Sequence, residues 1–244
     1  MNPSEGSGAS SPRGEGRRGL FLVIEGVEGA GKSTQVERLA HWIDALGIEA
    51  VRAREPGGTA VGEAVREILL DREELRIGAE SELFLMLAAR AAFMREFVRP
   101  TLQRGAVMIA DRFEFSTFAY QGFGRGLPLE EVRRLNAFAT GGLRPDLVLI
   151  LDLPAAEGRA RQRTAGKVDD RIEASGDGFL ERVASGYRVL AEEDDRAVLV
   201  DALLEPDGVE SRIRSELALR FPEPFGTAGG STTSKQPEPP PLSE

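Results

Sequence analysis

The sequence predicts an α/β fold in which helices cover both faces of a five-stranded parallel sheet. Short apolar runs alternate with helical patterns along the chain, as they do in strand–helix–strand units. Such crossovers are almost always right-handed, so ligands are expected at the carboxyl ends of the strands, where polar residues and glycines occur. The strands are expected at residues 20–24, 49–53, 106–110, 147–151 and 197–201.

The length and composition bound the domain organisation. The chain has 244 residues, enough for one large domain, which we expect at residues 19–221. Residues 1–18 and 222–244 are rich in small, polar or proline residues, and we expect both to be disordered tails.

The overall charge and the apolar content argue against several classes of partner. The chain carries 31 basic and 40 acidic residues, a formal net charge of −9, so we expect no nucleic acid and no anionic membrane as a partner. No apolar stretch has the length of a signal peptide or a membrane span, and no cysteine is present for disulfides or thiolate metal sites. We therefore expect a cytoplasmic protein.

The first expected strand leads directly into a phosphate-binding pattern. The pattern G-x-x-x-x-G-K-[S/T] is matched without a gap by Gly26-Val27-Glu28-Gly29-Ala30-Gly31-Lys32-Ser33, with Thr34 after it and a helical pattern from Gln35. Glycines let backbone N–H groups point at a phosphate near the positive end of a helix dipole. Lys32 is expected to reach the terminal phosphates, and Ser33 to bind the Mg²⁺ that bridges them. The pattern predicts a P-loop NTPase fold that binds a nucleoside triphosphate.

Two further segments bring charged residues toward the expected site. The turn Arg54–Thr59 follows the second strand, and the third strand ends in Asp111. Asp111 lies where a P-loop protein places a second carboxylate directed at Mg²⁺. The helical pattern of residues 80–103 carries Arg90 and Arg95 among its apolar positions, and a solvated face is the simplest interpretation of both.

An unusually basic segment follows the fourth strand. Its cations are Arg159, Arg161, Arg163, Lys167 and Arg171. One interpretation is a small mobile lid, about residues 159–175, whose cations close over a transferring phosphate. The other is an exposed basic helix whose charge is balanced by neighbouring acidic residues, namely Asp169, Asp170 and Glu173. The residues alone leave both interpretations open.

Four motifs, taken in order, resemble those of the thymidylate (dTMP) kinases, a family of P-loop nucleoside monophosphate kinases. They are FLVIEGVEGAGKSTQ at 21–35, REPGGT at 54–59 with Gly62, Glu63 and Arg66 after it, DRFEFSTFAYQG at 111–122 and DRIE at 170–173. The resemblance covers about residues 19–221. It implies that ATP and dTMP are converted to ADP and dTDP by direct in-line phosphoryl transfer with Mg²⁺, commonly by a homodimer.

The resemblance also implies roles for single residues. Residues 26–34 would hold the ATP phosphates, with Mg²⁺ on Ser33 and Asp111 in its outer shell. The P-loop has no arginine at Gly29, as in the glutamate-type bacterial branch, in which the lid supplies the cation. The catalytic residues would be Lys32, Arg112, Arg161 and Arg163, although Lys167 is a further candidate for the γ-phosphate contact. The dTMP site would be formed by Glu28, Arg54, Pro56, Arg66, Met86, Arg90, Arg112, Ser116, Tyr120 and Gln121.

Three positions depart from the family pattern. Met86 stands four residues before Arg90, where the family usually has a phenylalanine that stacks on thymine. Phe84 is two positions away, about 160° round a helix, so it is not a simple substitute. Phe113 replaces a tyrosine, and the lid is one residue longer than in the common bacterial form.

Two other functions compete with this interpretation. A deoxynucleoside kinase would use thymidine as acceptor and would need a base to deprotonate its hydroxyl. A nucleotide-dependent switch or binding module would hydrolyse slowly, but the N-K-x-D motif normal in GTP-binding switches does not occur. An arginine-rich acceptor site together with a basic lid favours two bound nucleotides. A kinase homologue made inefficient by Met86 is a third alternative.

Overall fold

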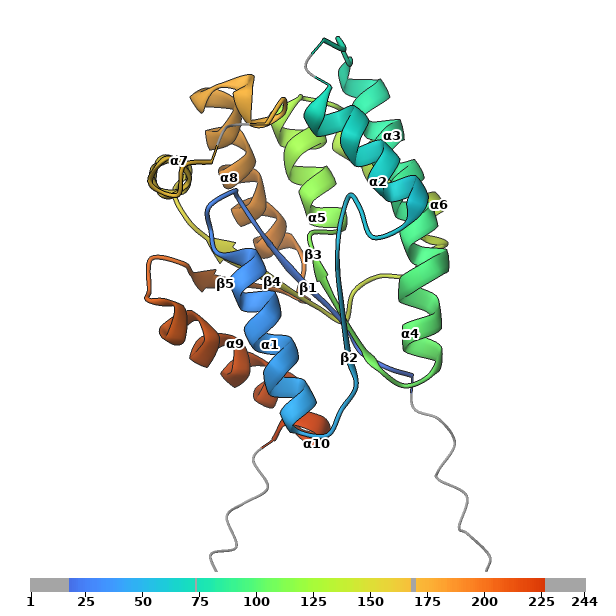
Figure 1. Cartoon of the computed structure of the whole chain (residues 1–244), viewed down its shortest axis with the longest axis vertical. Coiled ribbons are helices and arrows are strands. Elements are labelled where there is room, and N and C mark those ends of the chain that lie inside the picture. The colour runs from blue at the N-terminus through green and yellow to red at the C-terminus, as the bar shows by residue number, and fades with distance from the viewer. Residues whose placement is uncertain (1–17, 73, 168–169, 227–244) are drawn as a thin grey trace, which may run out of the picture.

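The computed structural model describes residues 18–72, 74–167 and 170–226 (Figure 1). Its centre is a five-stranded sheet with all neighbouring strands parallel and the order β2-β3-β1-β4-β5. The prediction of a parallel five-stranded α/β fold is therefore confirmed. The strands are β1 (Phe21–Gly26), β2 (Ala50–Arg54), β3 (Val107–Asp111), β4 (Leu147–Asp152) and β5 (Ala197–Asp201).

Helices cover both faces of the sheet, as the alternating pattern predicts. Helices α1 and α9 pack on one face, and α4, α5 and α8 on the other. Within the described residues, the π-helical segments η1 (Glu67–Asp71), η2 (Met94–Val98) and η3 (Phe118–Gly124) continue α2, α3 and α5, and a short 3₁₀ turn, η4 (Glu173–Ser175), precedes α8. The helices are α1 (Lys32–Ala45), α2 (Ala60–Arg66), α3 (Ala79–Phe93), α4 (Arg99–Gln103), α5 (Glu114–Thr117), α6 (Leu129–Thr140), α7 (Ala155–Thr164), α8 (Asp177–Glu193), α9 (Pro206–Arg220) and α10 (Pro222–Phe225).

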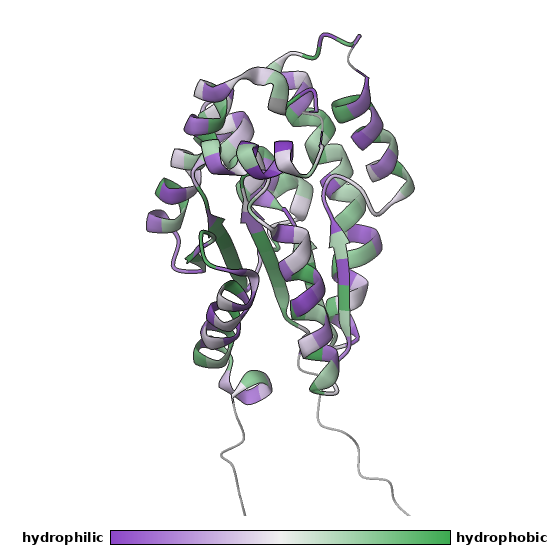
Figure 2. Cartoon of the chain, turned by 60° about the vertical axis from the view of Figure 1, so that its left-hand side comes forward, coloured by the Kyte–Doolittle hydropathy of each residue, from purple (hydrophilic) through white to green (hydrophobic). Residues whose placement is uncertain are grey.

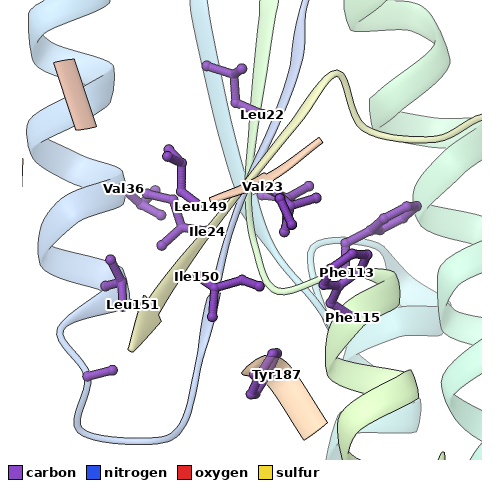
Figure 3. Close-up of a cluster of buried hydrophobic side chains, with 14 of the residues drawn as sticks. Leu22, Val23, Ile24, Val36, Phe113, Phe115, Leu149, Ile150, Leu151 and Tyr187 are labelled. Carbon is purple, nitrogen blue, oxygen red and sulfur yellow. The ribbon is translucent and has the colours of Figure 1, made fainter. Parts of the chain in front are cut away.

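The hydrophobic core lies between the sheet and these two helical layers. Every residue of β1 is buried, which explains why its sequence is a near-continuous apolar run rather than an alternating one. Figure 3 shows Val36 of α1 on one side of the central strands and Phe113, Phe115 and Tyr187 on the other. Apolar residues fill the central strands, while hydrophilic residues gather on the outer surfaces of the helices (Figure 2). No helix in the described ranges is long and apolar enough to span a membrane.

The strand order positions the functional segments. Because β1 lies between β3 and β4, the loop after β1 begins beside the end of β3, and Ile24 pairs in register with Asp111. The two segments are far apart in the sequence, but both end at the carboxyl edge of the sheet. This edge is where the sequence places its polar residues.

The expected boundary of the C-terminal tail at residue 222 is wrong. Pro222–Phe225 forms α10, and the ring centroid of the buried Phe225 lies 5.4 Å from that of Trp42 on α1. The high proline content suggests a disordered segment, yet Pro222 occupies the first turn of a helix, where a missing N–H costs nothing. Most of the two expected tails, residues 1–17 and 227–244, lies outside the described residues.

Candidate active site

The P-loop connects β1 to α1 at the carboxyl edge of the sheet. Gly26, Gly29 and Gly31 have φ angles of 135°, 78° and 92°, a region that side chains with a Cβ rarely adopt. The loop ends at the N-terminus of α1, where backbone N–H groups and the helix dipole favour an anion. The glycines in the pattern therefore meet a conformational requirement of the observed loop.

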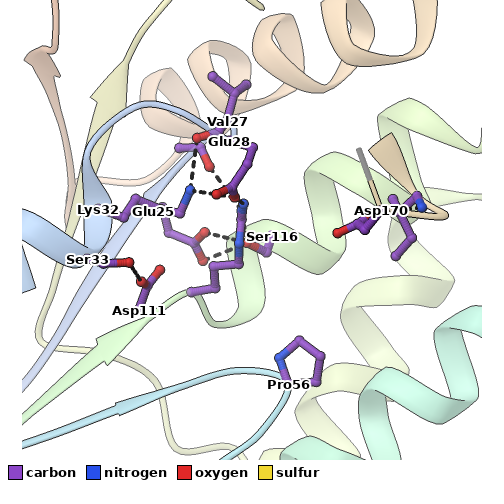
Figure 4. A network of polar contacts seen from close by, with 12 residues as sticks. Glu25, Val27, Glu28, Lys32, Ser33, Pro56, Asp111, Ser116 and Asp170 are labelled. Atoms are coloured by element: carbon purple, nitrogen blue, oxygen red, sulfur yellow. Dashed lines mark hydrogen bonds and ion pairs between the residues drawn. The ribbon is translucent and has the colours of Figure 1, made fainter. Parts of the chain in front are cut away.

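Lys32 begins α1 and lies under the loop that precedes it. Its Nζ donates to the carbonyl of Val27 at 2.9 Å and lies 3.4 Å from a carboxylate oxygen of Glu28 (Figure 4). Burial and the neighbouring guanidinium of Arg112 lower the pKa of Lys32. The ammonium group is thus held at the mouth of the loop by two acceptors that a phosphate could replace.

Ser33 and Asp111 meet although 78 residues separate them in the sequence. The Ser33 hydroxyl donates to the Asp111 carboxylate at 2.9 Å. A hydroxyl and a carboxylate beside a phosphate-binding loop are oxygen donors of the kind that Mg²⁺ prefers, so these residues fit the ion. In the described part of the chain, no group of three or more histidine, cysteine or acidic side chains could hold a metal alone. A magnesium ion here would therefore depend on phosphate oxygens as well.

Arg112 follows β3 and points back to the P-loop. Its φ of 74° makes it the one non-glycine residue with positive φ in the described ranges, a conformation that costs on the order of 1–3 kcal/mol. Its guanidinium donates to the carbonyl of Gly26 at 3.0 Å and to the carboxylate of Glu28 at 2.8 Å. Burial tends to raise the pKa of Glu28, but the charges of Lys32 and Arg112 outweigh burial and lower it to about 2. One ionised carboxylate therefore holds the cations of two different segments.

A buried carboxylate, Glu25, holds two hydroxyl groups that contact this arginine. Glu25 accepts hydrogen bonds from the hydroxyls of Ser116, at 2.6 Å, and Tyr187, at 3.0 Å. Those two hydroxyls lie 3.2 and 3.4 Å from the Arg112 guanidinium. Burial raises the pKa of Glu25. Tyr187 comes from α8, outside every motif of the sequence, so no linear signal points to it.

Two cavities open at the carboxyl edge, and Glu28 lines both. We call the first the P-loop cavity; it is lined by Glu28, Gly29, Gly31, Lys32, Ser33, Thr34, Arg161, Gln162, Ala165 and Lys167. We call the second the acceptor cavity; its lining includes the predicted residues Glu28, Pro56, Arg66, Met86, Arg90, Arg112, Ser116, Tyr120 and Gln121. The two cavities meet where Glu28 joins Lys32 to Arg112.

Arg90 forms part of the wall of the acceptor cavity. It is buried, and its guanidinium donates to Glu55 at 2.8 Å, to the Asn136 side chain at 2.8 Å and to the carbonyl of Phe113 at 2.9 Å. The interpretation of a solvated face is therefore wrong for Arg90. It holds for Arg95, which is exposed and pairs with its neighbour Glu96. The difference arises from Glu55 and Asn136, which are distant in sequence.

The basic segment contributes to both cavities. Arg161 on α7 and Lys167 after it line the P-loop cavity, whereas Arg163 is not among the described residues that line it. The Arg161 guanidinium also donates to the carbonyl of Ala202 at 2.9 Å. Arg171 instead donates to the Glu82 carboxylate at 2.7 Å, next to the acceptor cavity. Of the acidic residues expected to balance the cluster, Asp169 lies outside the described residues.

Helix α7 touches the P-loop backbone to backbone. A Cβ on Gly29 would lie 2.3 Å from the carbonyl oxygen of Gly158, and a Cβ on Gly158 would lie 2.3 Å from the carbonyl oxygen of Glu28. Both distances are far below any real contact, and the atoms met belong to the main chain. A side chain at position 29 is therefore incompatible with the observed position of α7.

Known proteins are similar to this chain in sequence and in fold. A family model described as thymidylate kinase matches residues 24–213. The chain is 47% identical over 205 residues to the thymidylate kinase of Desulfovibrio desulfuricans, covering 81% of this chain and 94% of that protein. It is 50% identical over 185 residues to the thymidylate kinase of Pseudomonas fluorescens, covering 75% and 88%. The chain belongs to the thymidylate kinase family. The crystal structure of thymidylate kinase from Ehrlichia chaffeensis matches with a TM-score of 0.67 at 27% identity, covering 83% of this chain and 99% of that one.

Most residues suggested by the resemblance to thymidylate kinases gather at the two cavities. Arg54 does not: it is exposed, pairs with Glu63 and is not among the described residues that line the acceptor cavity. Met86 does line that cavity, while Phe84 is 58% exposed, as its helical phase predicts. Five lining residues are missing from the expected set, namely Glu55, Leu70, Thr117, Asp170 and Ile172. Four of these adjoin or belong to the quoted motifs, which is the signal that could have found them.

Proposed function

We propose that this chain catalyses transfer of the γ-phosphoryl group of ATP to dTMP, giving ADP and dTDP. The observation that carries the proposal is the junction of the two cavities. Glu28 lines both, and its carboxylate contacts Lys32 of the P-loop and Arg112 after β3. Phosphates of a donor and of an acceptor would therefore meet at one pair of cations, as in-line transfer requires.

The residues at this junction supply positioning and positive charge. Phosphate oxygens of the two nucleotides would replace the Glu28 carboxylate on Lys32 and Arg112, and Arg161 and Lys167 lie on the far wall of the P-loop cavity. These cations would neutralise the charge that spreads over the moving phosphoryl group. No general base is required, because a phosphate monoester with a second pKa of about 6 is largely dianionic near neutral pH. Mg²⁺ held by Ser33, with Asp111 beside it, would add charge neutralisation at the donor phosphates.

The acceptor cavity suits a pyrimidine deoxynucleotide. Met86 offers a polarisable apolar surface to the base, Gln121 offers an amide to its edge, and Tyr120 and Ser116 lie beside the sugar end near Arg112. The methyl group of thymine adds roughly 1–3 kcal/mol of discrimination, so dUMP should be a poor but real substrate.

The enzyme acts as a homodimer in the cytoplasm, in keeping with the family. Support for the dimer comes from apolar side chains on three helices that pack side by side: Val61 on α2, Phe84 on α3 and Phe138 on α6 are 45, 58 and 89% exposed. Exposed apolar patches on neighbouring elements commonly mark protein interfaces. Light scattering should give twice the mass of the chain, and Phe138→Asp should shift it toward the monomer. Cell fractionation tests the location.

A coupled ADP-release assay with an acceptor panel tests the reaction. Turnover should be fastest with dTMP, slower with dUMP and slowest with dCMP and dGMP. Faster turnover with thymidine than with dTMP would instead indicate a deoxynucleoside kinase, and slow ATP hydrolysis that no acceptor accelerates would indicate a switch. Lys32→Ala should lose far more than a factor of ten in turnover, because Lys32 is the P-loop cation at the junction.

A further inference from the structure

A buried carboxylate behind the acceptor cavity has no part in the mechanism above. Glu82, in the first turn of α3, has no exposed surface. Its Oε1 accepts from Gln121 Nε2 at 3.0 Å and from Arg125 Nε at 3.1 Å. Its Oε2 accepts from Arg125 Nη2 at 3.1 Å and from Arg171 Nη2 at 2.7 Å. Both oxygens are thus used, and two of the partners are cations.

The charge state of Glu82 fixes which way the Gln121 amide faces. Burial favours the neutral acid, but hydrogen bonds from Arg125, Gln121 and Arg171 outweigh burial and lower the pKa of Glu82. An ionised carboxylate has no hydrogen to donate, so the amide nitrogen of Gln121 must face it. Within the described part of the chain, this is the one hydrogen bond of the Gln121 amide, and Gln121 lines the acceptor cavity. Its oxygen is therefore left to accept from a ligand there.

An acceptor oxygen at this position distinguishes the pyrimidines by chemistry. Thymine and uracil carry a hydrogen on N3 and can donate to the amide oxygen. Cytosine has a bare N3 lone pair, which would face that oxygen without a hydrogen bond. Buried polar groups left unpaired in this way are the strongest source of substrate discrimination.

We propose that Glu82 is a positioning residue that sets pyrimidine selectivity by holding the Gln121 amide with its oxygen toward the base. The proposal rests on the acceptor cavity being the dTMP site. Glu82 acts through Gln121 and does not itself touch the nucleotide.

The same carboxylate also holds the end of the basic segment. Arg171 shares Oε2 and donates through Nε to the carbonyl of Leu69 at 2.7 Å, and Arg125 donates to the Ser175 hydroxyl at 2.8 Å. Residues on both sides of this anchor line the acceptor cavity, Leu70 after Leu69 and Ile172 after Arg171. Loss of the Glu82 charge therefore loosens the cavity wall at the same time as it frees the amide to rotate.

The variant Glu82→Gln tests the proposal, with Glu80→Gln as control because Glu80 is an exposed residue in the same helical turn. A glutamine at 82 can accept or donate, so the Gln121 amide is free to flip. We expect the ratio of kcat/KM for dTMP to that for dCMP to fall at least tenfold in E82Q and to stay unchanged in E80Q. Urea unfolding of both variants confirms that they are folded under assay conditions.

A third variant, Gln121→Leu, separates failure of this proposal from failure of the proposed site. If Q121L lowers the dTMP to dCMP ratio and E82Q does not, the positioning role of Glu82 is wrong and the dTMP site stands. If neither variant changes the ratio, Gln121 does not read the base and the assignment of the cavity fails. If E82Q lowers kcat equally with every acceptor, the role of Glu82 is merely structural, and the proposal is also overturned.

Discussion

The buried pair of Glu55 and Arg90 predicts an unusual pH dependence of stability. Glu55 is 4% exposed, only Oε2 accepts from Arg90 at 2.8 Å, and Oε1 has no partner among the described residues. Burial outweighs the attraction of Arg90 and raises the pKa of Glu55 from 4.5 to about 7. The ionised pair should therefore destabilise the fold, contrary to the usual expectation for an ion pair.

The sign and size of the effect follow from linkage. The folded protein keeps the Glu55 proton to a higher pH than the unfolded chain, so the stabilising contribution is complete below pH 4.5 and is lost as pH rises through about 7. A shift of this size corresponds to about 3 kcal/mol in total. Between about pH 5.5 and about pH 8.5 the free energy of unfolding should fall by about 2 kcal/mol relative to a variant that cannot titrate at this position.

Urea unfolding of the parent and of Glu55→Gln across that pH range measures this difference. The stability of E55Q relative to the parent should rise with pH, and Glu80→Gln corrects for the loss of one negative charge at an exposed position. The reasoning is refuted if E55Q becomes less stable relative to the parent as pH rises. That result would place the folded-state pKa of Glu55 below 4.5 and make the pair with Arg90 stabilising.

Two further predictions concern helix α7. Gly158→Ala should lower kcat about 10²-fold, because the added Cβ would displace either α7 or the P-loop. Misplacement of catalytic groups by about 1 Å has effects of that size. The control is Gly178→Ala, which should leave kcat unchanged, because a Cβ there meets no heavy atom nearer than 3.8 Å. Steady-state kinetics of both variants decide this, and equal rates would show that the contact is not needed for turnover. Arg161→Ala should lower kcat on the order of 10³-fold, as loss of an arginine finger does, while Arg163→Ala should have the kcat of the parent. If Arg163→Ala lowers kcat more than Arg161→Ala does, the catalytic cation is Arg163.

Short-range sequence patterns predicted those parts of the site that are formed by consecutive residues. The P-loop needs glycines at particular φ angles and a helix start, and both are local properties, so the pattern from Gly26 to Ser33 located the loop. Asp111 was found for a related reason, because the end of a buried strand in a parallel sheet lies beside its neighbours. The resemblance placed Met86 in the acceptor site, and the helical phase separated Phe84 from it, as the structure has them.

Long-range contacts decided the rest. Only the resemblance placed Arg90 at the site, because the buried partners that hold it, Glu55 and Asn136, come from 35 residues before it and 46 after it. Arg161 and Arg163 are two positions apart and therefore lie on opposite sides of α7. The sequence pattern does not say which of the two faces the P-loop cavity. Tyr187 could not be predicted at all, since its role arises from α8 packing beside Glu25. In each case the determining factor is a partner brought in by the fold.

The contact between Gly29 and Gly158 gives a physical reason for the missing P-loop arginine. Resemblance alone says that the family branch lacks this side chain and takes its cation from the lid. In the structure, main-chain atoms of α7 occupy the space that a side chain at position 29 would need. The same close approach carries Arg161, three residues further along α7, to the wall of the P-loop cavity. A side chain at position 29 would displace the helix that carries Arg161, so at this distance an arginine can reach the P-loop cavity from the loop or from α7, but not from both.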